Sequence, residues 1–212
     1  MCRLLLVKSE QPFAMQPHLQ AFAHIAESSR EYQGHGWGCA WLAGGEWQTY
    51  HNIQPVWQDS FSRFGETTLL LAHARSAFQD KDIRVENNMP FSDGTYQFIF
   101  NGELRGVTIR ADGRIGAEKI FNFIRRFDKG DMAAAVRKAV PIISRKSRYV
   151  RAMNIIIADK QRVYLASQFS EDPDYFTMHT KTSDGRLIIC SEVYPGEQGW
   201  QPIANQTIQV FP

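Results

Sequence analysis

The second residue of the chain, Cys2, carries a thiol directly after the initiator methionine. Methionine aminopeptidase removes Met1 when the next side chain is small, so Cys2 can become the mature amino terminus. Its thiol would then lie beside its own α-amine, whose pKa of about 8 suits it to accept the thiol's proton. Because cysteine occurs at this position by chance in many proteins, the signal is weak by itself.

A second candidate is the pair Asn101-Gly102, which follows the apolar run Phe98–Phe100. A strand that ends at Asn-Gly can direct an amide NH2 group and a backbone N–H toward one point, and two such donors suit the oxyanion of an acyl-transfer reaction. An ordinary Asn-Gly turn between two strands explains the same residues and is the more common case.

A third candidate, Arg75-Ser76, lies at the end of a predicted buried strand. The planar guanidinium of arginine pairs with carboxylates in a bidentate manner, so Arg75 could hold the carboxylate of a substrate, with Ser76 beside it. A structural Arg–Asp ion pair explains the arginine equally well. We interpret His73, in the same segment, as a hydrogen-bonded structural residue, because the Cys2 amine would serve as the base.

Two further patterns bear on binding. The segment Gly34-His35-Gly36-Trp37-Gly38 places three glycines around an aromatic residue, which indicates a close backbone approach or positive φ angles, or simply a tight turn. The six histidines and three cysteines show neither H-x-x-x-H nor C-x-x-C spacing, and no phosphate-binding glycine-rich loop is present. We therefore expect no metal and no cofactor.

The composition is that of an ordinary globular chain. Its 212 residues are 43% hydrophobic, and 24 basic against 22 acidic residues leave a net charge of +2, which indicates neither a nucleic-acid nor a membrane partner. The three widely spaced cysteines favour a reducing compartment, and no signal peptide or membrane-length apolar run is evident. We expect a cytoplasmic protein with a single domain over residues 2–212.

The periodicity of apolar residues predicts the elements that position these candidates. We expect strands over residues 2–7, 38–42, 47–51, 67–74, 96–100, 154–158, 162–167, 175–180, 186–191 and 207–211. Helices are expected over residues 17–27, 56–64, 117–127 and 132–143. The dipeptides Gly44-Gly45 and Asp184-Gly185 indicate hairpin turns. Strands on both sides of two central helices predict an α+β fold of two packed sheets with helices outside.

Taken together, the motifs resemble the class II glutamine amidotransferase domain of the N-terminal-nucleophile (Ntn) hydrolases. The matching segments, in order along the chain, are 1–5, 34–38, 72–75, 86–91, 98–104 and 190–192. The sequence most resembles small stand-alone members of this family, which act on γ-glutamyl compounds. The resemblance covers nearly the whole chain, although each motif is short.

The resemblance implies a four-layer αββα sandwich of two antiparallel sheets flanked by helices. It also implies that Cys2 attacks the γ-amide carbon of glutamine or another γ-glutamyl amide, while Asn101 Nδ2 and the Gly102 N–H stabilise the oxyanion. Arg75 would bind the α-carboxylate. Ammonia or an amine would leave, and water would hydrolyse the γ-glutamyl thioester without a cofactor.

Three positions depart from the family pattern. Phe78 stands where threonine is common, and Met89 where a histidine often precedes the Pro-Phe pair. Gly116 stands where the family places an aspartate that binds the substrate's α-ammonium group. These departures predict that the substrate is not free glutamine, or that its amine is held differently, with Glu118 as the candidate.

The sequence leaves several functions open. The chain could be a free-standing hydrolase, or the glutaminase subunit of a complex that passes ammonia to a separate synthetase chain. It could also be a catalytically silent binding or scaffolding subunit, which the three departures favour. A third possibility is another type of Ntn amidase, which would have the same fold and nucleophile. Arg75 and Asn101-Gly102 favour an amidotransferase over this alternative.

Overall fold

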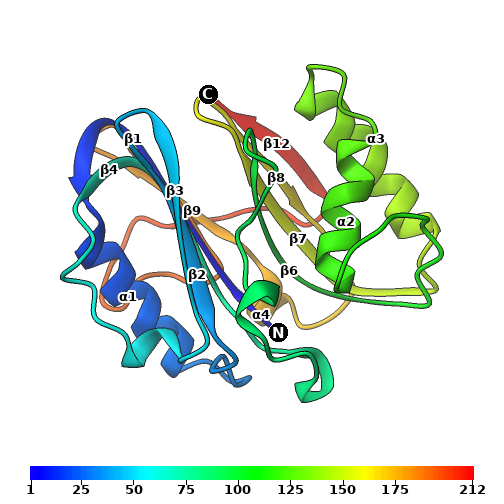
Figure 1. Cartoon of the computed structure of the whole chain (residues 1–212), viewed down its shortest axis with the longest axis horizontal. Helices are drawn as coiled ribbons and strands as arrows, with labels where there is room; N and C mark the ends of the chain where they lie inside the picture. Colours follow the sequence, from blue (N-terminus) through cyan, green and yellow to red (C-terminus); the bar gives the residue numbers. More distant parts are fainter.

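The computed structural model describes all 212 residues, and its two antiparallel β-sheets pack face to face with helices on their outer faces (Figure 1). The helices are α1 (Met15–Glu27), α2 (Gly116–Arg125), α3 (Met132–Arg145) and α4 (Pro173–Phe176), with single 3-10 turns at Val56–Gln58, Phe78–Asp80 and Val85–Asn87. The strands are β1 (Arg3–Ala14), β2 (Trp37–Ala43), β3 (Glu46–Asn52), β4 (Glu66–Ala74), β5 (Phe91–Ser92), β6 (Gln97–Arg105), β7 (Tyr149–Ala158), β8 (Val163–Ser167), β9 (His179–Ser183), β10 (Arg186–Cys190), β11 (Gln201–Pro202) and β12 (Thr207–Phe211).

One sheet has seven strands in the order β11-β9-β10-β1-β4-β2-β3. Its central strand β1 begins with a continuous apolar run, as expected for a strand buried on both faces. Leu4 and Leu6 pack between the two sheets, whereas Leu5 and Val7 pack with α1 on the outer face. The start of β1, and with it Cys2, is therefore fixed by packing on both sides.

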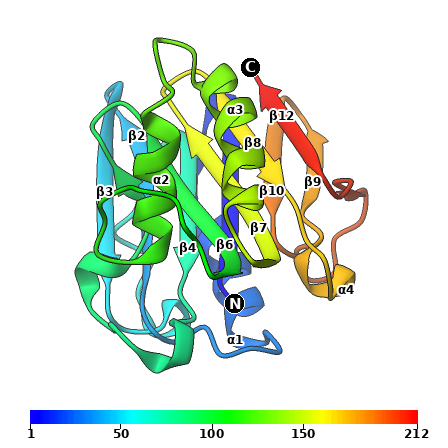
Figure 2. The ribbon, with the colours of Figure 1, turned by 90° about the vertical axis from the view of Figure 1, so that its right-hand side faces the viewer.

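The second sheet has five strands in the order β12-β8-β7-β6-β5. Helices α2 and α3 lie side by side over it, as Figure 2 shows. The apolar stripe of α2 packs on the sheet, and the rings of Phe98 and Phe121 stack with centroids 4.9 Å apart. Burying side chains of this size stabilises the fold by about 1.5–3 kcal/mol each. The start of α2 is thereby held at one end of β6.

The structure confirms the expected αββα sandwich and both predicted hairpin turns. Asp184 and Gly185 have φ angles of 52° and 71°, and Gly44 and Gly45 have 59° and 78°, which is the left-handed region that tight hairpins require. No helix of this fold is both long and apolar enough to cross a lipid bilayer.

Three local predictions are wrong. Residues 175 and 176, the start of the strand predicted over 175–180, belong to helix α4, because Pro173 lacks a backbone N–H and suits the first helical position. The predicted helix over 56–64 is a single turn, and Phe61 and Phe64 instead pack their rings on Trp37. The strand predicted to end at residue 100 continues through Asn101-Gly102 to Arg105.

Candidate active site

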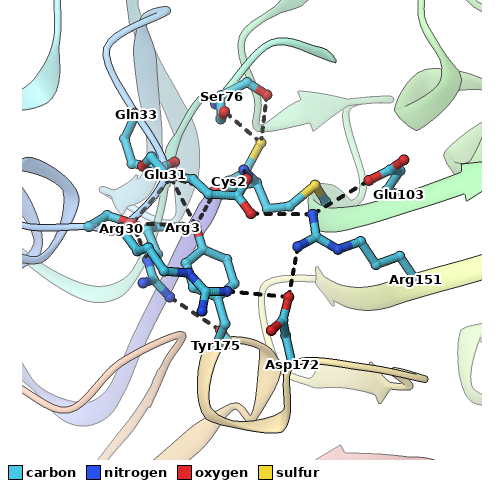
Figure 3. Close-up of polar contacts among 12 residues, drawn as sticks. Cys2, Arg3, Arg30, Glu31, Gln33, Ser76, Glu103, Arg151, Asp172 and Tyr175 are labelled. Carbon is cyan, nitrogen blue, oxygen red and sulfur yellow. Dashed lines mark hydrogen bonds and ion pairs between the residues drawn. The ribbon is translucent and has the colours of Figure 1, made fainter. Parts of the chain in front are cut away.

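Cys2 lies where the start of β1 meets the end of β4. The two strands pair with Arg3 opposite Ala74, which brings Cys2 beside the segment that follows β4. Ser76 N donates a hydrogen bond to Cys2 Sγ at 3.5 Å, and Sγ lies 3.6 Å from Ser76 O (Figure 3). The antiparallel register therefore places the thiol next to the predicted substrate-binding segment.

A cavity of about 730 Å³ opens at this end of the two sheets. Four of the six predicted site residues line it: Cys2, Arg75, Ser76 and Gly102. Its walls come from the amino terminus, the segment after β4, the second half of β6 and the start of α2. The fold thus assembles in one cavity residues that lie about a hundred positions apart.

Arg75 is buried in the cavity wall without a counter-ion. Its side chain is 5% exposed, its Nη1 atom has no hydrogen-bond partner, and it forms no ion pair. The structural Arg–Asp pair considered above is therefore absent. Burial lowers the pKa of Arg75 from its usual value, and the charges of Cys2 and Asp82 oppose the shift. A buried guanidinium with an unused donor is suited to bind an anion from the cavity.

Gly102 presents a free backbone donor at the edge of β6. It faces Met153 on β7, and Met153 exchanges both of its backbone hydrogen bonds with Gln168 on its other side. The Gly102–Met153 pair is therefore of the non-hydrogen-bonded type, in which the N–H points away from the partner strand. β5 pairs only with residues 97 and 98, so no strand covers this N–H, which is available to a ligand.

Asn101 is fully buried, and neither atom of its amide group has a hydrogen-bond partner. It faces Asn154 on β7, and cross-strand partners share one face of a sheet. On that face Asn154 Nδ2 donates to Phe176 O at 2.8 Å, and Ala152 forms an apolar cluster against which Met1 packs. The Asn101 amide therefore lies on the side of β6 that faces the amino terminus, although it does not line the cavity.

The amino terminus is held by side chains that the sequence did not single out (Figure 3). The Met1 ammonium group forms an ion pair with Glu31, and the Met1 carbonyl accepts hydrogen bonds from Gln33 Nε2 and from Tyr175 Oη, the latter at 2.8 Å. Gln33 is fully buried, and its Oε1 atom has no partner. This cluster fixes the backbone that carries the Cys2 thiol.

Arg151, on β7, ties this cluster to the five-stranded sheet. It pairs with four carboxylates, at 3.2 Å to Glu31, 3.5 Å to Glu103, and 2.8 Å to each of Glu171 and Asp172. Arg3 and Arg30 add cation–π contacts to the ring of Tyr175, with centroid distances of 4.1 and 4.8 Å. No local motif reveals this network, because its members come from five separate segments.

Burial raises the pKa of the Cys2 thiol above its usual value. The positive charges of the Met1 ammonium and Arg75, together with the backbone hydrogen bond from Ser76, act in the opposite direction. Because a raised pKa favours the neutral thiol, a nearby base is needed to form the thiolate nucleophile.

Comparison with solved structures places this architecture among known folds. A protein described as a glutamine aminotransferase class-II domain protein, from Silicibacter pomeroyi, superposes with a TM-score of 0.62 at 16% identity, covering 99% of this chain and 94% of its own. A predicted glutamine amidotransferase from Pseudomonas aeruginosa gives 0.61 at 15% identity, covering 99% and 97%. The chain has the fold of class II glutamine amidotransferase domains.

The same fold occurs within a longer enzyme. Glutamine phosphoribosylpyrophosphate amidotransferase from B. subtilis matches with a TM-score of 0.62 at 12% identity, over 90% of this chain. The chain spans 42% of the length of that enzyme. No protein-family model and no curated protein match the sequence.

Within this amidotransferase fold, Glu118 lies outside the cavity lining. Its carboxylate takes hydrogen bonds from Arg114, at 2.6 Å from Nη2 and 3.0 Å from Nε. The pKa of Glu118 is lowered, mainly by this contact. Gly116 does line the cavity, and a side chain there would meet open space. The predicted contact of Glu118 with a substrate amine therefore gains no support from its position.

The glycine cluster serves close packing rather than ligand contact. Gly36 has a φ of 103°, and a side chain on it would overlap the amide of Asn88. A side chain on Gly38 would press against the carbonyl of Met89, whose side chain lines the cavity. The glycines thus let the segment before β5 approach β2.

Two buried histidines predict a pH-dependent stability. His73 is fully buried between the sheets, where the backbone of Phe100 is its polar neighbour. Burial lowers the pKa of His73 to about 3 and that of His18 to about 4. The unfolded chain, with histidine pKa values of about 6.5, therefore binds more protons below pH 6.5 than the fold does.

We therefore expect the free energy of unfolding to fall by about 1.4 kcal/mol per pH unit for each of these histidines below pH 6. Urea denaturation between pH 7 and pH 4.5 measures this slope. His73→Leu removes one of the two titrating groups and should make the dependence shallower. A slope that is the same in this variant would show that His73 is not neutral in the fold.

Proposed function

We propose that this protein hydrolyses γ-glutamyl amide bonds, with the Cys2 thiol as nucleophile. The observation that carries the proposal is one cavity in which a thiol, a buried guanidinium without a counter-ion and an unpaired backbone N–H lie together. These groups match the three needs of the reaction, namely attack on a carbonyl, a hold on the substrate's carboxylate and stabilisation of the oxyanion.

The reaction begins after Met1 has been removed. The α-amine of Cys2 takes the thiol proton, and Sγ forms a bond to the γ-carbonyl carbon. Charge develops on the carbonyl oxygen, where the Gly102 N–H and Asn101 Nδ2 donate hydrogen bonds. One such donor contributes about 3 kcal/mol to lowering the barrier.

The tetrahedral intermediate then collapses. The carbon–nitrogen bond breaks, and the leaving ammonia or amine takes the proton back from the Cys2 ammonium. Water, deprotonated by the same amine, attacks the γ-glutamyl thioester, and the thiol leaves with that proton. Arg75 holds the α-carboxylate through both steps, with Ser76 beside the thiol.

Gln33 and Tyr175 fit this scheme as positioning residues for the amine. They donate hydrogen bonds to the Met1 carbonyl oxygen, and the carbon of this carbonyl is bonded to the Cys2 nitrogen. Gln33 Oε1 has no partner and could accept a hydrogen bond from the amine once Met1 is gone. The mass of the intact purified protein shows whether Met1 has been removed.

A catalytically silent binding subunit is the second candidate. It is favoured by the complete set of partners that surrounds Met1, because a retained Met1 leaves Cys2 without a free amine. An intact mass that includes Met1, with no amidase activity, would support this candidate.

The direct test is a panel of γ-glutamyl amides with ammonia, amine and glutamate as the measured products. Release that depends on Cys2 supports the hydrolase. Co-purification with an ammonia-accepting synthetase chain would instead identify a glutaminase subunit. The substrates are small molecules in either case.

We predict that Arg75→Gln lowers kcat/KM for γ-glutamyl amides about 10- to 100-fold, mainly through KM, because the substrate's carboxylate loses a charged partner. The free energy of unfolding should stay the same or rise, since the change removes a buried charge without a counter-ion. Arg114→Gln is the matched control, because Arg114 lines the cavity but pairs with Glu118. Unchanged KM with a large loss of stability would assign Arg75 a structural role.

A further inference from the structure

The charges that line the cavity are unsuited to a second ammonium group. Its basic side chains are Arg75, Lys81, Arg114, Lys119 and Arg151, and its carboxylates are Glu31, Asp82 and Glu103. Glu31 and Glu103 share the guanidinium of Arg151, and Arg114 is paired with Glu118. The lining cations without a carboxylate partner are therefore Arg75, Lys81 and Lys119. Asp82 is the single lining carboxylate without an ion pair, and it is exposed.

The start of α2 adds a further positive potential. This helix of ten residues has no side-chain cap, since its N-cap residue is Ile115, and Gly116 and Ala117 line the cavity. The first backbone N–H groups of a helix lack partners within the helix, and its dipole is positive there. The acidic residue of the first turn, Glu118, is paired with Arg114. This end of the cavity therefore favours an acceptor oxygen over a cation.

Arg75 gives an independent indication of where a ligand lies. Only 5% of Arg75 is exposed to solvent, its Nη1 atom has no hydrogen-bond partner, and the residue lines the same cavity. In a glutamine-type substrate the α-nitrogen and the carboxylate share one carbon atom. A carboxylate on Arg75 therefore brings the α-nitrogen into the region that the basic groups dominate.

The remaining wall is apolar and the cavity is large. Among the residues that line it from the end of β6 to the start of α2 are Leu104, Val107, Ile109, Ile115 and Ile120, and Val107 is 39% exposed. The volume of about 730 Å³ lies within the range of pockets that enclose ligands much larger than a free amino acid.

From these observations we infer that the substrate is a γ-amide whose α-nitrogen is acylated rather than a free ammonium. The acyl oxygen accepts hydrogen bonds from the free N–H groups at the start of α2. The acyl chain lies on the apolar wall, while the carboxylate binds Arg75. This inference rests on the proposed function and specifies its substrate class.

The test compares kcat/KM for three amides, namely glutamine, N-acetylglutamine and glutaramic acid, which lacks the α-nitrogen. We expect N-acetylglutamine to exceed glutamine at least tenfold and to exceed glutaramic acid as well. A preference for glutamine would overturn the inference. Equal rates for glutaramic acid and N-acetylglutamine would overturn the role of the acyl group.

Gly116→Asp provides the matched variant, because a side chain at this exposed position meets open space. The new carboxylate at the start of α2 should shift the ratio of kcat/KM at least tenfold toward glutamine. Gly65→Asp is the control, since Gly65 is also exposed with open space around it and lies outside the cavity. An unchanged ratio in Gly116→Asp would contradict the proposed position of the α-nitrogen.

Asp82→Asn tests the one free carboxylate of the cavity. If this change by itself lowers kcat/KM for glutamine, Asp82 binds the α-ammonium group and the inference is wrong. Calorimetric affinities of the Cys2→Ala protein for glutamine and N-acetylglutamine decide the preference without turnover. If the unmodified protein hydrolyses neither amide but the Cys2→Ala protein binds N-acetylglutamine more tightly than glutamine, the hydrolase proposal is refuted and the acyl-amide site is supported.

Discussion

Cys2→Ala should reduce amide hydrolysis to background, a loss of about a thousandfold or more, because no other group can form the thioester. Cys2 is only half-buried and precedes the first residue of β1, so the fold should remain intact. Ammonia release and circular dichroism, measured on the same preparation after the mass has confirmed Met1 removal, test both statements.

The other two cysteines supply the control for this prediction. Cys39 and Cys190 are fully buried, and burial raises the pKa of Cys190 to about 12 and that of Cys39 further still. Both thiols are therefore protonated and shielded. Cys39→Ala should lower thermal stability and leave kcat unchanged. Residual activity above a tenth in Cys2→Ala would mean that a different group is the nucleophile.

Asn101→Ala should lower kcat about 100- to 1,000-fold with little change in KM, because its amide is proposed to donate only to the oxyanion. Little stability should be lost, since the amide has no partner in the fold. Steady-state kinetics and urea denaturation of the variant measure the two effects separately.

Asn154→Ala is the matched control, since Asn154 lies directly opposite on β7 and is equally buried. Its amide bonds Phe176 O and Ser167 Oγ, each at 2.8 Å. Its loss should therefore cost about 1–3 kcal/mol of stability while reducing kcat less than Asn101→Ala does. A reversed pattern, with kcat preserved in Asn101→Ala, would leave Gly102 as the remaining oxyanion donor.

A network of charged side chains holds the amino terminus before Met1 is removed. Arg151 joins Glu31 to β6 and to the α4 segment, and Glu31 in turn binds the terminal ammonium. These contacts hold Met1 in the unprocessed chain, and after its removal the thiol is still positioned by the Ser76 N–H and by the pairing of Arg3 with Ala74. Local disorder, which is common at chain ends, would otherwise spread the thiol over many positions.

The sequence alone determined most of the architecture. Apolar periodicity located β1, β4, β7 and the helices α1 to α3, because burial of one or both faces imposes a repeat that can be read residue by residue. Where burial and local preference disagree, the prediction failed. Thus Tyr175 and Phe176, predicted to begin a strand, belong to a helix that starts at Pro173, and Asn101-Gly102 continues a strand despite its turn-like composition.

The candidate site divides in the same way. Its thiol, guanidinium and Asn-Gly pair could be named from the sequence because their chemistry is a property of each residue. Tertiary structure decided that Arg75 has no counter-ion, that Glu118 is bound by Arg114, and that the Gly102 N–H faces away from β7. It also assembled the Glu31–Arg151 network. Pairing of charges and of strand edges depends on which distant segments meet in space, and the fold alone sets those distances.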